Sequence, residues 1–329
     1  MRLENLHIVV TGGMGYVGSH VAKTLKAMGA RVSIVDRRYN AHVMKFCDHF
    51  TLTEYNNKNT LDHYREQQVN GFIHCAGTSL VGPSVLNPSE YYNNNVVKTI
   101  DFLDQIRTWD TRPFVVFSSS AATYGTPKTL PIDETVELNP ISPYGRTKLF
   151  IEQILEDYHR AYGLRSISLR YFNAAGADIW GSELGPEPND SHLIPKIFEA
   201  YQTGNPFTIN GQDFNTPDGT CIRDYVHVSD LALAHARCCD ALLNNDVNWR
   251  INLGTNHGVS NQQMVDAFTN IVGPVDIDYG SRRDGDPDSL VASNRLAKLN
   301  LNWEPVYSGV DTLIKSTADW YSKKVFADA

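Results

Sequence analysis

Short runs of apolar residues alternate with longer amphipathic stretches through the first half of the chain. The apolar runs have the length of buried strands and lie at residues 7–10, 31–35, 71–76, 114–117 and 166–171. Helical periodicity occupies residues 17–28, 89–109 and 144–162. Strand and helix in alternation predict an α/β fold built on a doubly wound parallel sheet.

The pattern changes after residue 173. Residues 181–190 are rich in glycine, proline and acidic side chains, which predicts a loop. Helical patterns separated by short strands follow at residues 193–201, 229–243, 260–271 and 310–321. We therefore expect a first domain at residues 1–173, to which residues 226–255 return, and a smaller C-terminal α/β lobe at residues 174–329. Because ligands of open parallel sheets bind beyond the carboxyl ends of the strands, the cleft between the two lobes is the expected site.

The composition narrows the possible partners. Of the 329 residues, 42% are hydrophobic and 20% are charged, the balance of a folded protein. The net charge of −8 argues against a nucleic-acid partner, because binding to a phosphate backbone needs a basic surface. The five cysteines are odd in number and scattered, so we expect neither a disulfide framework nor a metal site. Without a signal-peptide pattern or an apolar stretch of roughly 20 residues, a cytoplasmic protein with no membrane partner is expected.

A glycine-rich turn at residues 12–18 follows the first strand and opens a helix. Gly12, Gly15 and Gly18 match the spacing G-x-x-G-x-x-G. Glycine lets the backbone approach a pyrophosphate closely, and a helix N-terminus favours an anion. Asp36 ends the second strand, where a carboxylate can accept hydrogen bonds from the ribose hydroxyls of an adenosine. The combination predicts a Rossmann-like site for NAD, since Asp36 would repel a 2′-phosphate.

Two other interpretations of this region stay open. The glycines can form a tight turn that binds no ligand. Arg37 and Arg38 follow Asp36 directly and could pair with a 2′-phosphate. A solvated strand exit is the interpretation we favour for these two arginines.

A candidate catalytic group lies at residues 142–148, which contain Tyr-x-x-x-Lys. Tyr144 and Lys148 share one helical face, because residues four apart are neighbours on a helix. A tyrosine has a reference pKa near 10, and a nearby ammonium together with a cationic nicotinamide ring should lower it. Tyr144 could then remove a hydroxyl proton near neutral pH. The run Ser118 to Ser120 closes a predicted strand at its carboxyl end and can bond the same hydroxyl. Taken singly, each of these groups is also compatible with an ordinary polar surface.

The chain resembles the extended short-chain dehydrogenase/reductase family and, within it, the UDP-glucose 4-epimerases. The likeness covers nearly the whole chain and is carried by residues 11–20, 118–125, 142–148, 169–173, 218–228 and 282–286. The first and third of these segments are common to the superfamily. The segment Asp-Gly-Thr-Cys-Ile-Arg-Asp-Tyr-Val-His-Val at 218–228 is far more specific to the epimerases.

The resemblance implies interconversion of UDP-glucose and UDP-galactose by transient oxidation at C4 of the sugar. The catalytic residues would be Tyr144, which takes the hydroxyl proton, with Ser120 and Lys148. Residues implied to bind the cofactor NAD are Gly12, Gly15, Tyr16, Val17, Asp36, Ala76, Asn94, Ser118, Lys148 and Tyr171. Residues implied to bind the UDP-sugar are Ser120, Tyr144, Asn173, His192, Leu193, Arg223, Tyr225, Arg283, Asp286 and Leu290. Paired N–H donors suit Arg223 and Arg283 to a diphosphate. The resemblance also implies a homodimer formed by pairing of the helices at 89–109 and 144–162.

The chain departs from the family pattern at several positions. Ser79 replaces a lysine that helps to hold NAD, Thr53-Glu54 replaces an Asp-hydrophobic pair at the adenine, and His192 replaces an asparagine beside the diphosphate. Leu290 stands at a position where tyrosine accompanies glucose specificity and a small residue accompanies acceptance of N-acetyl groups. We therefore expect weaker retention of NAD, and weak activity on N-acetylated sugars.

Several alternative functions share the fold. A 4-epimerase of UDP-N-acetylhexosamines or of UDP-uronic acids is the nearest alternative. A nucleotide-sugar dehydratase is less favoured, because Ala121 and Ala122 replace the acid and base that elimination needs. A plain dehydrogenase would release reduced cofactor. A non-catalytic dinucleotide-sensing protein could dispense with the tyrosine and the lysine, both of which this chain has.

Overall fold

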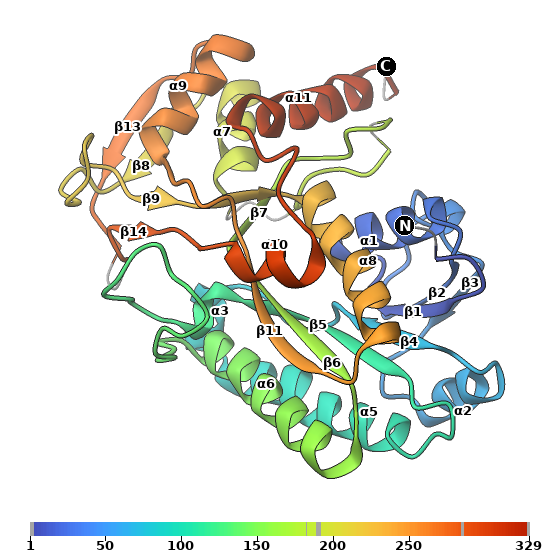
Figure 1. The fold of residues 1–329 in the computed structure, drawn as a ribbon. Coiled ribbons are helices and arrows are strands. Elements are labelled where there is room, and N and C mark those ends of the chain that lie inside the picture. The colour runs from blue at the N-terminus through green and yellow to red at the C-terminus, as the bar shows by residue number, and fades with distance from the viewer. Residues whose placement is uncertain (1–2, 182, 189–191, 284–285, 328–329) are drawn as a thin grey trace.

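A seven-stranded parallel sheet forms the centre of the molecule (Figure 1). The computed structural model describes residues 3–181, 183–188, 192–283 and 286–327. The strand order is β11-β6-β5-β4-β1-β2-β3. The bounds are β1 (His7–Thr11), β2 (Arg31–Asp36), β3 (His49–Leu52), β4 (Gly71–His74), β5 (Phe114–Ser120), β6 (Ser166–Tyr171) and β11 (Asn248–Leu253). The chain leaves β1 toward β2 and later returns to β4 on the other side of β1, so the doubly wound fold predicted from the sequence is confirmed.

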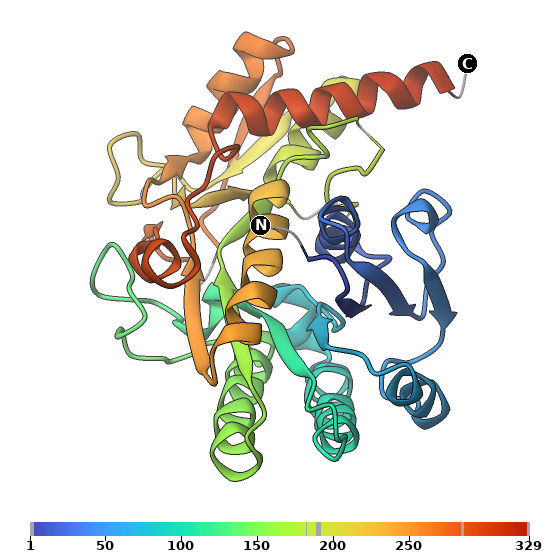
Figure 2. The ribbon, with the colours of Figure 1, turned by 45° about the vertical axis from the view of Figure 1, so that its right-hand side comes forward.

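Helices cover both faces of this sheet (Figure 2). One face carries α1 (Tyr16–Ala27) and α8 (Val228–Asn244); the other carries α2 (Lys58–Glu66), α5 (Lys98–Ile106) and α6 (Pro143–Tyr162). Alternation along β1 divides the apolar side chains between two cores. Ile8 and Val10 belong to the core beneath α1 and α8, whereas Val9 packs with Phe72 and Phe102 in the other. Burying each such side chain is worth about 1.5–3 kcal/mol.

The helix predicted at 89–109 is not one continuous α-helix and ends earlier than predicted. It consists of α4 (Pro88–Tyr91), a π-helical segment η2 (Tyr92–Val97) and α5, and it ends at Ile106. The wide π turn occurs where Asn95 is bonded to structure outside the helix. Its side chain accepts a hydrogen bond from the Thr78 N–H and donates to the Thr78 carbonyl oxygen and to Thr147 Oγ1. Periodicity alone did not reveal β3, α2, the short α3 (Val81–Leu86) or the turns η1 (Met44–Phe46) and η3 (Ala121–Thr123).

The second lobe lies above the carboxyl ends of the sheet strands (Figures 1 and 2). Its strands are β7 (Asn173–Ala175), β8 (Phe207–Asn210), β9 (Ile222–Arg223), β10 (Tyr225–His227), β12 (Val259–Ser260), β13 (Ile277–Gly280) and β14 (Ser289–Leu290). Its helices are α7 (Leu193–Thr203), α9 (Asn261–Ile271) and α11 (Val310–Ala327). A separate core that includes Ile197, Phe198, Phe268 and Leu313 holds this lobe together. The helix α10 (Arg295–Leu301) instead packs against α8 and β11 of the first domain. Between β10 and β12 the chain returns to the first sheet through α8 and β11.

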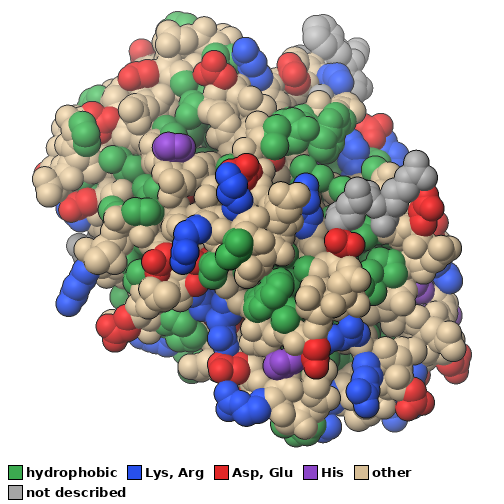
Figure 3. All heavy atoms as spheres, viewed as in Figure 1, with side chains coloured by type: hydrophobic (Ala, Val, Ile, Leu, Met, Phe, Trp, Pro, Cys, Tyr) green, Lys and Arg blue, Asp and Glu red, His purple; other side chains and the backbone are tan. Residues whose placement is uncertain are grey.

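Acidic and basic side chains are interspersed on the molecular face shown in Figure 3. Of the helices in the described part of the chain, none is both long enough and apolar enough to cross a bilayer. Within the predicted segments 181–190 and 282–286, residues 182, 189–190 and 284–285 lie outside the described residues.

Candidate active site

One cleft of about 1590 Å³ lies between the two lobes, at the carboxyl ends of β1, β2, β4, β5 and β6. The residues predicted to bind the cofactor all line it: Gly12, Gly15, Tyr16, Val17, Asp36, Ala76, Asn94, Ser118, Lys148 and Tyr171. The residues predicted to bind the sugar nucleotide line it as well: Ser120, Tyr144, Asn173, His192, Leu193, Arg223, Tyr225, Arg283, Asp286 and Leu290. Positions up to 278 residues apart in the chain, Gly12 and Leu290, thus face one space.

The glycine-rich turn has the shape of an anion cradle. Gly12 has a φ of 71°, and a Cβ atom there would lie 2.6 Å from the backbone nitrogen of Ala76. A Cβ atom on Gly18 would lie 2.3 Å from the carbonyl oxygen of Gly12. Gly15 caps α1 without a side-chain hydrogen bond, and the first turn of α1 holds no acidic residue. The N-terminus of α1 therefore presents N–H groups and a partial positive charge to the cleft, as a dinucleotide pyrophosphate requires.

Asp36 is fixed at the end of β2 with its carboxylate facing the cleft. The side chain is 8% exposed. Oδ2 accepts a hydrogen bond of 3.0 Å from the Met14 N–H, and Oδ1 accepts one of 2.9 Å from the Arg38 N–H. Each oxygen keeps acceptor capacity for a ribose hydroxyl. The geometry fits the adenosine ribose of NAD.

The side chains of the two arginines after Asp36 point to different places. Arg37 NH1 lies 3.6 Å from Glu54 Oε1, and its side chain is exposed, in keeping with a solvated strand exit. Arg38 instead turns back over the glycine-rich turn, where its NH2 lies 3.6 Å from the position of a Cβ atom on Gly15. Arg38 is thus a cationic group beside the expected pyrophosphate that the sequence analysis treated as surface.

The far end of the cofactor cleft contains a second charged group that the sequence analysis missed. Lys98 Nζ donates a 3.0 Å hydrogen bond to Glu54 Oε1, and both residues line the cleft. Ser79, the position of the absent lysine, also lines it, and its carbonyl oxygen accepts from the Tyr91 hydroxyl. Lys98 therefore supplies a cation to the cleft, and this cation is paired with Glu54.

Tyr144, Lys148 and Ser120 meet where α6 begins beside the end of β5. Ser142 caps the helix by accepting a hydrogen bond from the Gly145 N–H, and Pro143 suits the first helical position. Lys148 Nζ lies 5.7 Å from the centre of the Tyr144 ring and donates a 2.7 Å hydrogen bond to the Ser118 carbonyl oxygen. Ser120 lines the same cleft, and its side chain is among the groups that influence the pKa of Tyr144. These groups can address one substrate hydroxyl together.

Burial is the largest influence of the protein on the pKa of Tyr144. Burial raises this pKa above its usual value, and the hydrogen bond from Ser120 only partly opposes the rise. Burial also lowers the pKa of Lys148 to about 8, against the nearby charges of Cys75 and Glu152. The Lys148 ammonium lies 4.8 Å from the Phe117 ring centre, closer than to the Tyr144 ring. The lowering expected from an ammonium and a nicotinamide ring acts against this cost of desolvation.

A neutral polar group forms the floor of the cleft below Ser118. Ser118 Oγ lies 3.2 Å from Cys75 Sγ and 3.2 Å from His235 Nε2. His235 Nδ1 is 2.8 Å from the Leu231 carbonyl oxygen, so Nδ1 carries the proton and Nε2 accepts. Burial lowers the pKa of His235 to about 4, which keeps the ring neutral at physiological pH. No sequence motif pointed to Cys75 or His235, because their meeting depends on the packing of α8 against β5.

The two arginines on the sugar-nucleotide side differ in burial. Arg223 is buried and donates to the carbonyl oxygens of Ile222 and Pro287, at 2.8 and 3.0 Å, and pairs with Asp286 at 3.3 Å. Arg283 is exposed at the rim of the cleft. Of the residues predicted to bind the diphosphate and its ribose, Arg223 and Asp286 therefore bond to one another.

Leu290 lies at the boundary between the cleft and a small core. It lines the cleft and packs against the cluster of Ala121, Tyr124 and Ile132, next to Phe172. Its strand β14 pairs with β9 so that Leu290 stands beside Arg223. A size gate, the role that the resemblance implies, and a core position in this cluster both agree with that placement.

The remaining predicted residues are fixed by backbone structure. Asn173 and Tyr225 stand opposite each other on β7 and β10. His192 is the N-cap of α7, and Leu193 is its first helical residue. Tyr16, at the start of α1, donates a 2.7 Å hydrogen bond to the Gly176 carbonyl oxygen and so joins the two lobes. In the described residues, no group of three or more histidine, cysteine or acidic side chains is placed to hold a metal ion.

Comparison with known proteins agrees with this geometry. The model of the NAD dependent epimerase/dehydratase family matches residues 8–254. A UDP-glucose 4-epimerase of Halalkalibacterium halodurans is 39% identical over 320 residues, 96% of each chain. The crystal structure of a UDP-glucose 4-epimerase from Brucella ovis in complex with NAD is 41% identical, with a TM-score of 0.90 over 96% of this chain and 98% of that one. A UDP-glucose-4-epimerase from Stenotrophomonas maltophila with bound NAD and formylated UDP-arabinopyranose is 31% identical, with a TM-score of 0.92 over 98% of this chain and all of that one. The chain belongs to the NAD dependent epimerase/dehydratase family.

Proposed function

We propose that this chain is an NAD-dependent UDP-glucose 4-epimerase, an isomerase that interconverts UDP-glucose and UDP-galactose. The observation that carries the proposal is the meeting of Ser120, Tyr144 and Lys148 in the same cleft as the glycine-rich turn and Asp36. The family and the names of similar proteins support the same activity and the same cofactor.

The residues of the chain suit transient oxidation at C4 of the sugar. Tyr144 takes the proton of the 4-hydroxyl, while Ser120 bonds that hydroxyl and Lys148 supplies a positive charge nearby. Bound NAD supplies the hydride acceptor for C4–H and then the donor that returns the hydride to the opposite face. Tyr144 gives the proton back to the sugar oxygen in the second half. The reaction is redox-neutral, so the cofactor is regenerated in every turnover.

The second lobe is proposed to hold the UDP part. We assign Arg223 and Arg283 to the diphosphate and Asp286 to the uridine ribose, with Asn173, His192, Leu193 and Tyr225 around the nucleotide. Substrate binding then requires Arg223 and Asp286 to exchange their mutual contact of 3.3 Å for contacts with the ligand. The domain assignment follows: residues 1–173 with 226–255 bind NAD, and the rest of 174–329 binds the UDP-sugar.

Product analysis tests the activity. NAD-loaded protein is incubated in parallel with UDP-glucose, UDP-N-acetylglucosamine and UDP-glucuronate, and the sugars are separated after hydrolysis. We expect galactose from the first substrate at the highest rate and no accumulation of NADH. A steady release of NADH would indicate a dehydrogenase, and absence of all three products would overturn the proposal.

A 4-epimerase of UDP-N-acetylhexosamines is the second candidate, and Leu290 is the observation that favours it. Leucine lacks the phenol of the tyrosine found at this position in glucose-specific relatives, so the wall beside Phe172 leaves more room. In the parallel assay this candidate predicts N-acetylgalactosamine at a rate equal to or above that of galactose.

A homodimer is proposed on the exposed faces of η2 and α6. Tyr92 and Phe150 stack there with ring centres 6.2 Å apart, Phe150 is 40% exposed, and Val97 is 57% exposed. Apolar side chains gathered on two adjacent helices suit pairing with the same helices of a second copy. Sedimentation velocity should give twice the chain mass for the wild type, and Phe150→Arg should shift the protein toward the monomer. A wild type that sediments as a monomer at micromolar concentration would contradict the assignment.

We also propose a cytoplasmic location. The five cysteines are free thiols, and Cys221, Cys238 and Cys239 are buried. Free thiols persist in reducing compartments, whereas oxidising ones favour disulfides. Fractionation of the native cells should place the protein with cytoplasmic markers.

A further inference from the structure

The end of β5 is fastened to α6 at two successive residues. Ser118, Ser119 and Ser120 alternate in direction, as successive residues of a strand do. Ser118 and Ser120 line the cleft, whereas Ser119 points away from it and is 1% exposed. Ser119 Oγ donates a 2.5 Å hydrogen bond to Glu152 Oε1. The strand that carries the catalytic serine therefore has a second anchor on its hidden side.

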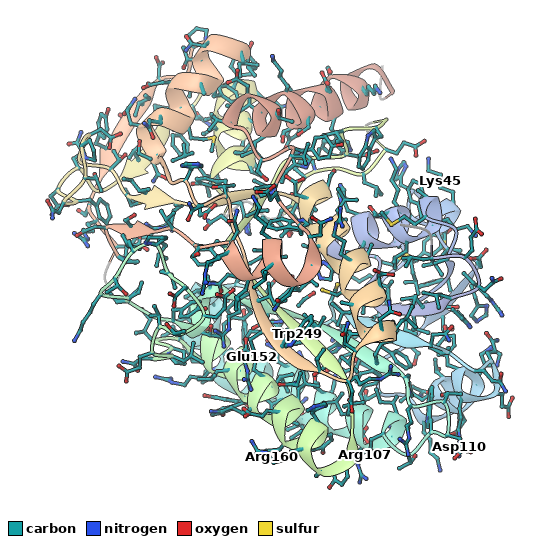
Figure 4. All side chains as sticks on the ribbon, in the orientation of Figure 1. Lys45, Arg107, Asp110, Glu152, Arg160 and Trp249 are labelled. Carbon is teal, nitrogen blue, oxygen red and sulfur yellow. The ribbon has the colours of Figure 1, made fainter. Side chains whose placement is uncertain are left out.

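Glu152 belongs to the same helix as the catalytic pair. It lies one helical turn after Lys148 and two turns after Tyr144. Figure 4 shows it on α6 close to the strands β6 and β11. Lys148 bonds the Ser118 carbonyl oxygen while Glu152 bonds the Ser119 hydroxyl. Two consecutive residues of β5 are thus held by two consecutive turns of α6.

A buried arginine fixes the Glu152 carboxylate in turn. Arg170 stands beside Ser119 in the register of β5 and β6. Its Nε donates to Glu152 Oε1 at 2.9 Å, and its NH2 donates to Oε2 at 2.5 Å. Arg170 NH1 also donates to the Tyr124 hydroxyl, which donates to Asn252 Oδ1 at 2.8 Å. The carboxylate is therefore held in one orientation by groups from β6, β11 and the turn after β5.

We propose that Glu152 is a positioning residue for the reaction, acting through Ser119 to hold Ser120 against Tyr144 and Lys148. The inference rests on the proposed function for its kinetic consequence. Glu152 and Ser119 do not line the cleft, so they do not contact the substrate. Catalysis is sensitive to displacements of about 1 Å between reacting groups, and loss of this anchor permits such displacements. The anchor therefore contributes to the rate of hydride transfer rather than to binding.

Ser119→Ala is the informative variant. Glu152→Gln would leave Arg170 with a buried charge lacking its ionised partner, a change that can unfold a protein outright. Ser119→Ala removes one hydroxyl and leaves that ion pair in place. Ser166→Ala is the matched control, because Ser166 is equally buried on the neighbouring strand β6 and accepts a 2.7 Å hydrogen bond from Asn248 at the opposite end of the sheet.

The kinetic readout separates positioning from a loss of folded protein. For Ser119→Ala we expect kcat per NAD-loaded molecule to fall by about tenfold, near the lower end of the range for one hydrogen bond to a charged group. KM for UDP-glucose and NAD content should stay near those of Ser166→Ala. The isotope effect with sugar deuterated at C4 should rise, because hydride transfer becomes slower relative to the other steps. Equal kcat and equal isotope effects in the two variants would overturn the proposal.

A structural readout keeps this inference separate from the proposed function. Hydrogen exchange of the amides at residues 118–122 should become faster in Ser119→Ala and remain as in the wild type in Ser166→Ala. Faster exchange without epimerase activity in the wild type would support the anchor and refute the assigned reaction. Unchanged exchange in Ser119→Ala would refute the anchor whatever the reaction.

Discussion

The two halves of the cleft are built differently. On the cofactor side, functional groups stand at the ends of strands of four to seven residues inside a seven-stranded sheet, and backbone bonds fix them. Asp36 is held by two N–H groups and Lys148 by a carbonyl oxygen. On the sugar side, β9 and β14 have two residues each. Arg223 and Asp286 there bond mainly to one another and to nearby carbonyl groups.

This difference matches the demands of the two tasks. Hydride and proton transfer need fixed distances between Tyr144, Ser120 and C4, which a rigid sheet edge supplies. A 4-keto sugar must turn over to receive the hydride on its other face, so the side that holds the sugar nucleotide must permit movement. A rigid cofactor half and an adaptable substrate half satisfy both requirements, and the predictions below separate them.

The largest effect is expected from Tyr144→Phe in the rigid half. The change keeps the ring and its packing but deletes the proton acceptor. We expect kcat to fall by about 10²-fold or more, the typical contribution of a positioned acid–base group. Far-ultraviolet circular dichroism and NAD content should match the wild type. Near-normal turnover would remove Tyr144 from its assigned role.

In the adaptable half, Arg223→Met should act on binding. The side chain keeps much of its length but loses the donors that the diphosphate requires. We expect kcat/KM for UDP-glucose to fall by about 30-fold, mainly through KM, which corresponds to ~2 kcal/mol for a charge-assisted contact. Isothermal titration with UDP provides the direct measurement. Asp286→Asn is the companion variant, because it releases Arg223 from its partner without removing the guanidinium. A fall in kcat at constant KM would mean that Arg223 contributes to the catalytic step rather than to binding. That result would contradict the division of tasks between the two halves.

The same contrast explains what the sequence could predict. Gly12, Gly15, Asp36, Tyr144 and Lys148 have fixed spacings along single strands, turns and helices, so local pattern was sufficient for them. Whether Arg223 pairs with Asp286 depends on three segments meeting, β9, β14 and the loop before β14, and no local pattern encodes that.

Other side-chain contacts of the site could not be predicted from the sequence, because they depend on which residues become buried together. His235 reaches Ser118 across 117 positions of chain, and Ser119 reaches Glu152 across 33. The burial that raises the pKa of Tyr144 could not be predicted for the same reason, because the cost of desolvation depends on all that packs around the ring.

Retention of NAD tests whether the cofactor half binds NAD tightly without a lysine at position 79. Ser79 brings no charge to the cofactor, and the nearby Lys98 ammonium is engaged with Glu54. We expect the purified protein to lose NAD on extended dialysis and to regain activity when NAD is added. Ser79→Lys should tighten NAD binding by about tenfold, roughly 1.4 kcal/mol. Val85→Lys is a control for added charge, because Val85 is exposed on α3 and does not line the cleft. Stoichiometric NAD after dialysis of the wild type, with no stimulation by added NAD, would show that Arg38 and Lys98 already replace the family lysine.

The smallest effect is expected at Leu290, where the adaptable half meets the rigid one. Leu290 packs against the cluster that contains Ala121, and Ala121 directly follows the catalytic Ser120 in the chain. Both Leu290 and Ala121 line the cleft, so added bulk at Leu290 should narrow the space for the sugar. An acetamido group needs that space, and intrusion into a packed wall costs on the order of 1–3 kcal/mol. For Leu290→Tyr we expect the ratio of kcat/KM for UDP-N-acetylglucosamine to that for UDP-glucose to fall by about fivefold, near the lower end of that range because a wall of two-residue strands can yield. Leu290→Met conserves volume and should leave the ratio nearly constant. Equal losses on both substrates would mean that Leu290 acts as a core residue of the cluster with Tyr124 and Ile132, and that sugar size is selected elsewhere in the second lobe.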